Sequence, residues 1–146
     1  MARMVLSTRH MTNALEKKRK TLAKYLEVVT LDTYDDLFVD GSEEWRVLTD
    51  TEANTAAREA ILESVWAFRP EFLAAHTVAG VDAETIRTIQ ENDKCESNNA
   101  VLTRLIDDVD HFVDDAIKAD GRGHFLSSYD SEEIELPGNL FAYRVN

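Results

Sequence analysis

The chain has little of the residue types that cross-link or interrupt a protein. Its 146 residues include one cysteine, Cys95, two prolines and five glycines. A single cysteine excludes an intramolecular disulfide and fits a reducing cytosol. No apolar run approaches the roughly 20 residues that span a bilayer, and the start MARMVLSTRH lacks the features of a signal peptide. We therefore expect a cytoplasmic protein that does not enter a membrane.

Positive charge is also scarce. Sixteen Lys and Arg stand against 28 Asp and Glu, which gives a net charge of −12. Residues 1–24 hold seven basic and one acidic side chain (+6), whereas residues 25–146 hold nine basic and 27 acidic ones (−18). Because this acidic body repels phosphates, it is not expected to bind nucleic acid directly. It fits a basic protein partner, or a surface whose charge only maintains solubility.

Length and composition predict a single domain over residues 1–146, with a basic N-terminal helix at about 12–29 and an acidic body at 30–146. Thr12 is placed to cap that helix. Apolar residues recur in it at three- and four-residue steps, and these are Leu15, Leu22, Tyr25, Leu26 and Val29. The run KKRK at 17–20 is interpreted as a solvated helix face, with contact to nucleic acid or pairing with the acidic body of a second copy in a homodimer as the alternatives.

Two β-hairpins are predicted, one on each side of a helical middle. The first hairpin would turn at Asp40-Gly41, between the β-prone runs LFV and WRVL. The second would turn at Pro137-Gly138-Asn139, between EEIEL and LFAYRV. Since an isolated hairpin is only marginally stable, we expect both to share one antiparallel sheet, with Trp45 and Tyr143 buried. The helices between the hairpins would cover one face. The predicted fold class is α+β, with four to five helices and this small antiparallel sheet.

The helices of the middle are predicted from their start and stop signals. Thr49-Asp50-Thr51-Glu52 has capping-box spacing and opens a helix that would end near Arg69. Pro70 fits the first turn of the next helix, and Asp82 the cap of another. NDKCESNN is predicted to be a loop, followed by one helix over about 98–119 that Gly121 ends in a left-handed conformation.

Residues 121–133, GRGHFLSSYDSEE, hold residue types that are common in catalytic loops. A typical catalytic triad is not expected, because its candidates lie too close together in sequence: His124, Ser127, Ser128 and Asp130. The spacing of the two glycines, Gly121 and Gly123, does not match a phosphate-binding loop. We expect a structural joint in which the serines and Asp130 bond local backbone, with a catalytic loop as the alternative. No catalytic residue is predicted.

The stretch DDVDHFVDD, residues 107–115, raises the question of a metal. Asp107, His111 and Asp115 are spaced i, i+4, i+8 and would lie along one helix surface, and such groups suit a divalent ion. Helical metal enzymes need ligands that converge from facing helices, and His76 stands alone in FLAAHT. No metal or other cofactor is therefore predicted. A metal-dependent enzyme using His111 and neighbouring aspartates is the alternative.

The same stretch also predicts an amphipathic helix with one acidic face. Its carboxylates pair well with arginine and lysine, and five of them are the predicted partner-binding residues: Asp107, Asp108, Asp110, Asp114 and Asp115. Carboxylates in a row imitate phosphates, so the expected partner is a basic nucleic-acid-binding protein or complex. A solvated face without a partner is the alternative.

The patterns GRGHFLSSYDSEE…FAYRVN and EEWRVLTDTEAN resemble small acidic proteins that are encoded by tailed phages and related mobile elements. The likeness covers about a third of the chain, and Ser131 stands where that group often has glycine. The group has no established activity to transfer. The resemblance implies a mobile-element protein that acts in the cytoplasm of the host cell and blocks a nucleic-acid-binding defence complex of the host, as anti-CRISPR and antirestriction proteins do. A phage accessory protein without mimicry is the alternative.

Overall fold

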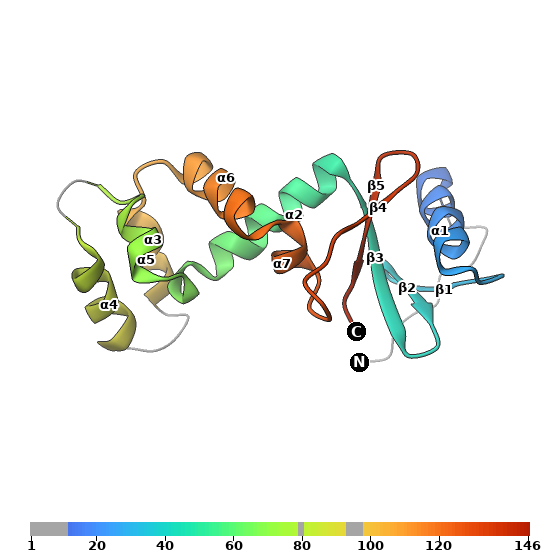
Figure 1. Ribbon diagram of the computed structural model, residues 1–146, viewed down its shortest axis with the longest axis horizontal. Helices are drawn as coiled ribbons and strands as arrows, with labels where there is room; N and C mark the ends of the chain where they lie inside the picture. The colour runs from blue at the N-terminus through green and yellow to red at the C-terminus, as the bar shows by residue number, and fades with distance from the viewer. Residues whose placement is uncertain (1–11, 79–80, 93–97) are drawn as a thin grey trace. The chain divides into compact units, whose positions relative to one another are not determined.

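The computed structural model describes residues 12–78, 81–92 and 98–146, and the fold is α+β, as predicted (Figure 1). These residues form seven α-helices, five of them seven residues or longer, and a five-stranded antiparallel sheet. The chain divides into two compact units, residues 1–56 with 122–146 and residues 57–121. The single domain stays a prediction. Cys95 and most of the loop predicted around it lie outside the described residues.

The sheet of the first unit joins both predicted hairpins. Its strands, in the order β1-β2-β3-β5-β4, are β1 (Asp32–Tyr34), β2 (Leu37–Asp40), β3 (Glu43–Thr49), β5 (Leu140–Arg144) and β4 (Ile134–Leu136). Strand β3 pairs with β5, which places Val47 opposite Ala142. The shared sheet is therefore confirmed. Strand β1 was not predicted, and it pairs with β2 after a tight turn at Asp35, whose φ is +56°.

The turns of the two hairpins lie where the sequence indicated. Gly41, with φ +61°, begins the two-residue loop between β2 and β3. Gly138 at φ +81° and Asn139 at φ +59° lie in the three-residue loop between β4 and β5. Short hairpin loops need such positive φ values, which glycine and asparagine adopt at low cost.

Strand β5 is buried on both of its faces. Leu140 and Ala142 belong to the core against helix α1 (Asn13–Leu26), and Phe141 and Tyr143 alternate onto the opposite face with exposed fractions of 8% and 0%. Trp45 is 5% exposed, so the predicted burial of both aromatic residues is confirmed. Helix α1 precedes both hairpins, so its packing against this strand does not test the expectation that the helices between the hairpins cover one face of the sheet.

Helix α1 begins as predicted and ends earlier. The Thr12 hydroxyl accepts a hydrogen bond from the Leu15 N–H (3.1 Å). The helix stops at Leu26 rather than Val29, because Glu27 takes φ +57° and its N–H bonds back to the last turn. Val29 is consequently 95% exposed, contrary to the predicted apolar stripe.

The regular elements of the second unit, in its described residues, are all helices. Its elements are the end of α2 (Asp50–Glu63), η2 (Val65–Ala67), α3 (Pro70–Ala74), α4 (Ala83–Asn92), α5 (Asn99–Leu105) and α6 (Val109–Asp120), while α7 (Arg122–Leu126) belongs to the first unit. The predicted capping box is confirmed by reciprocal bonds between Thr49 and Glu52 (2.9 and 3.2 Å). Pro70 starts α3, and the Asp82 carboxylate accepts from the Thr85 N–H (2.8 Å), also as predicted.

Helix α2 is shorter than predicted, ending at Glu63 rather than near Arg69. The Asn99 side chain supplies the reason. Its Nδ2 donates to the Leu62 carbonyl (2.7 Å) and its Oδ1 accepts from the Trp66 N–H (3.1 Å). In a continuing helix these two backbone groups would bond to each other, so Asn99 takes the place of that bond.

The prediction of a single helix over about 98–119 was wrong. The chain forms two helices there, α5 and α6, with residues 106–108 between them. Ile106 forms an antiparallel bridge with Thr77, and the Asp108 side chain caps α6 by accepting from the His111 N–H (3.1 Å). The backbone of residues 106–108 therefore takes part in the bridge and in the cap of α6, and it does not continue α5 as a helix. Asp107 and Asp108 precede α6 and do not share its helical surface.

Candidate functional site

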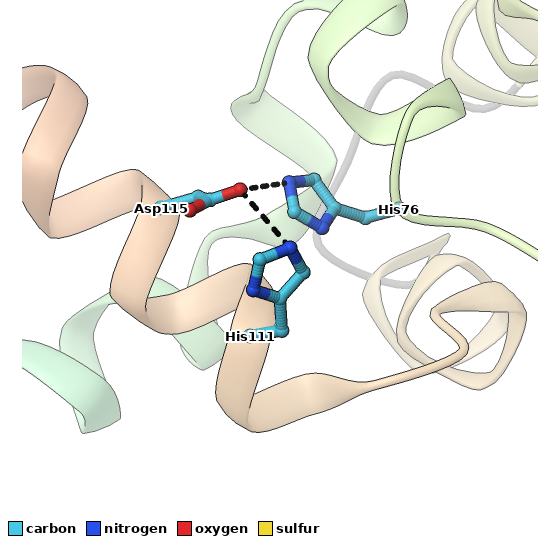
Figure 2. A group of neighbouring side chains, drawn as sticks. All are labelled: His76, His111 and Asp115. Carbon is cyan, nitrogen blue, oxygen red and sulfur yellow. Dashed lines mark ion pairs between the residues drawn. The ribbon is translucent and has the colours of Figure 1, made fainter.

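Two histidines and one aspartate converge in the second unit (Figure 2). His76 Nε2 lies 3.2 Å from Asp115 Oδ2, and His111 Nε2 lies 3.4 Å from the same oxygen. One potential ligand atom from each residue lies within 4.8 Å of the other two. We call these three residues the His-Asp cluster.

Helix α6 positions two of the three side chains. His111 and Asp115 are four residues apart, so they lie on one face of the helix. The helix is held in register by its buried residues Phe112, Val113 and Ala116. The His111 side chain is 63% exposed and that of Asp115 is 34% exposed, so the cluster is open to solvent at His111.

His76 reaches the cluster from the segment after α3. Its carbonyl oxygen accepts a hydrogen bond from the Asp107 N–H (2.9 Å), just before α6 begins. The residue is 9% exposed, and its ring packs against Phe72 and Phe112 with centroid separations of 5.2 and 5.5 Å. Backbone bonding and ring packing therefore fix the position of this imidazole.

The sequence indicated only half of this arrangement. The i, i+4 spacing of His111 and Asp115 was visible, but His76 was wrongly taken to stand alone. Asp107, the third member of the set considered from sequence, lies outside α6 and is not a member of the cluster. No spacing signal links His76 to residues 35 and 39 positions later, because contacts between distant segments bring them together.

The five predicted partner-binding aspartates have different surroundings. Asp108 caps α6, and Asp115 belongs to the His-Asp cluster. Asp110 forms an ion pair with Arg58 (2.6 Å), yet its side chain remains 81% exposed. Asp107 and Asp114 are exposed. On α6 the acidic face is therefore carried by Asp110 and Asp114, and the exposed Asp107 lies just before the helix.

The loop with catalytic residue types is bound to backbone. Asp130 accepts from the Glu132 N–H (3.0 Å), a local bond as predicted. Ser127 Oγ accepts from the Asp130 N–H (3.5 Å), a local backbone bond as predicted, and lies 2.7 Å from the Arg144 carbonyl oxygen. Ser128 Oγ donates to the Val145 carbonyl (2.9 Å), at the end of β5 and not within the loop. His124 is exposed. The geometry is that of a joint between α7 and the sheet.

Sequence reasoning missed Arg122, which organises the centre of the first unit. Its guanidinium bonds to Glu133 and Asp50 (2.7 Å each) and lies 4.6 Å from the centroid of the Phe141 ring. Glu133 also accepts a hydrogen bond from the Tyr143 hydroxyl. Burial lowers the pKa of Arg122, but the bonds to both carboxylates outweigh it and the pKa lies above its ordinary value.

A second unassigned feature is a cavity at the end of α2. It has a volume of about 530 Å³ and is lined by Ala60, Glu63, Ser64, Trp66 and Asn99. No member of the His-Asp cluster lines it. The cavity therefore does not supply a substrate pocket for that cluster.

Comparison with known proteins gives no assignment. The chain matches no protein-family model, no curated protein and no solved structure. None of the described helices has the length and apolar content needed to cross a membrane.

Proposed function

We propose that this protein is an acidic protein-binding inhibitor. Its acidic face occupies the nucleic-acid-binding surface of a basic host defence complex, in the manner of anti-CRISPR or antirestriction proteins that imitate nucleic acid. The proposal is carried by one observation: residues 57–121 hold 14 acidic and six basic side chains, and α6 buries its apolar stripe while presenting carboxylates to solvent.

Asp107, Asp110 and Asp114 are the contact residues of this proposal. Each is exposed, whereas Asp108 and Asp115 already have internal roles. Asp110 can exchange its partner Arg58 for an arginine of the complex, because an ion pair this exposed contributes little to stability. Carboxylates bind guanidinium groups in a bidentate manner, as phosphates do.

The metal-dependent enzyme considered from sequence is less well supported. The His-Asp cluster supplies ligands, but the cavity at the end of α2 is not lined by the cluster. Binding between charged surfaces needs no enclosed pocket, only complementary charge over an area of contact.

The test is displacement of nucleic acid from a basic defence complex purified from the host. Changing Asp107, Asp110 and Asp114 together to Asn keeps side-chain size and removes three charges. We expect affinity to fall at least about tenfold and binding to weaken steeply with salt, because charges separated by more than about 8 Å are screened at physiological ionic strength.

A matched control removes three charges elsewhere. Glu84, Glu91 and Glu135 are exposed and lie outside α6, and their joint change to Gln should lower affinity less than about threefold. Equal losses in both variants would show that net charge alone matters. Undiminished displacement by the aspartate variant would refute the proposal.

A further inference from the structure

We propose that the His-Asp cluster is a binding site for one divalent transition-metal ion of the Zn²⁺ class, held by His76 Nε2, His111 Nε2 and the Asp115 carboxylate. This inference is independent of the inhibitor function, because the contact residues of that function, Asp107, Asp110 and Asp114, are not ligands here.

The spacing of the ligand atoms supports the site. Zinc binds imidazole nitrogen and carboxylate oxygen at about 2.0–2.2 Å in tetrahedral geometry, which places neighbouring ligand atoms about 3.3–3.5 Å apart. Asp115 Oδ2 lies 3.2 and 3.4 Å from the two Nε2 atoms. One oxygen faced by two imidazole nitrogens at these distances forms two edges of such a coordination sphere.

The two segments that carry the ligands are fixed relative to each other. The Asp107 N–H donates to the His76 carbonyl (2.9 Å), and the Val78 N–H donates to the Leu105 carbonyl (3.0 Å). Asp108 caps α6 directly after this pairing. Little chain entropy is lost on binding an ion, because the ligand positions are set by these bonds before it arrives.

The donor set selects the class of metal. Two imidazoles and one carboxylate favour zinc and its first-row neighbours, whereas magnesium and calcium prefer oxygen ligands. Three protein ligands leave a fourth position for water. The exposed His111 side gives an ion access, while Phe72 and Phe112 pack against the buried imidazole of His76.

A bound ion would join the segment at residue 76 to α6. Because the unfolded chain does not hold these three ligands together, the ion would stabilise the folded state by mass action. We therefore expect Zn²⁺ to raise the melting temperature of the chain and Mg²⁺ to leave it unchanged.

The experiment uses the full chain and titrates Zn²⁺ by calorimetry, with Co²⁺ absorption as a second readout of coordination. We expect one saturable equivalent. His111→Gln and Asp115→Asn should each weaken binding at least about tenfold. In Zn²⁺ the melting temperature should rise by about 5 °C or more for the unaltered chain but not for these two variants.

His124→Gln is the matched control, because it removes an exposed histidine outside the cluster, and it should change affinity less than about threefold. Circular dichroism without metal checks that every variant is folded. Absence of saturable Zn²⁺ binding up to 1 mM (about −4 kcal/mol), or equal affinity of the His111→Gln and unaltered chains, would overturn the proposal and leave a histidine–carboxylate contact of structural value only.

Discussion

The Asn99 side chain donates to the Leu62 carbonyl oxygen at 2.7 Å and so closes the end of α2 from outside the helix. Its Oδ1 accepts from the Trp66 N–H, the natural partner of that carbonyl in a continuing helix. One amide therefore satisfies two backbone groups, lets the chain turn into η2 and α3, and ties the start of α5 to this turn.

Replacing Asn99 by Ala should lower the free energy of unfolding by about 2 kcal/mol, because both backbone groups lose their partner in a half-buried place. Chemical denaturation followed by circular dichroism measures this. Asn92→Ala, at the exposed end of α4, is the control and should change it by no more than about 0.5 kcal/mol. Equal effects would show that Asn99 does not hold the turn.

Gly123→Ala should destabilise the joint after α6. A Cβ at Gly123 would lie 2.5 Å from the Ser131 carbonyl oxygen, and 2.7 and 2.8 Å from backbone atoms of the next two residues. Backbone cannot yield as a side chain does, so we expect a cost of about 1–3 kcal/mol. His124→Ala, one position later and exposed, should cost less than about 0.5 kcal/mol in the same thermal melts. The reverse ranking would contradict the close approach.

Ser131→Gly should stabilise the chain. Ser131 has φ +62°, which an L-residue with a Cβ adopts at a cost of about 1–2 kcal/mol. Glycine avoids this cost but loses more entropy on folding, so a net gain of about 0.5–1 kcal/mol is expected in urea denaturation. A loss of stability would mean that the serine side chain matters more than the backbone angle. Ser128→Gly, which removes a bond to the Val145 carbonyl, should destabilise.

Tyr143 should limit stability at alkaline pH. Burial, followed by the hydrogen bond to Glu133, raises the pKa of its hydroxyl above the ordinary value. The folded state therefore favours the neutral hydroxyl, and this contribution is complete below about pH 10 and is lost as the pH rises further. Tyr143→Phe should cost about 1–2 kcal/mol at pH 7, with a difference from the unaltered chain that shrinks above pH 10.

Melting curves at a series of pH values measure this difference. Tyr25→Phe is the control, since Tyr25 is 51% exposed. It should leave the curve of stability against pH unchanged. A difference between the Tyr143→Phe and unaltered chains that stays constant from pH 7 to 11 would argue against the buried hydroxyl as the titrating group.

The sequence by itself determined the features that act within a few residues. The Thr12 and Asp82 caps, the Thr49–Glu52 capping box and Pro70 at the start of α3 were all predicted. Each depends on bonds or fixed torsions between near neighbours. The hairpin turns follow for the same reason, because their glycines permit the positive φ that the turn requires. The burial of Trp45 and Tyr143 followed from the shared sheet that two weak hairpins need.

Only the tertiary structure decided where helices stop and which polar side chains meet. Asn99 ends α2 from 37 residues away. The antiparallel bridge of Thr77 with Ile106, made by bonds of Asp107 to His76 and of Val78 to Leu105, breaks the helix predicted there. Asp108, a common capping residue, was the one local signal of that break. His76 joins His111 and Asp115, because packing brings separate segments together and leaves no spacing pattern in the chain. The physical reason is range: capping and turn preferences are local, whereas these contacts exist only after the core has formed.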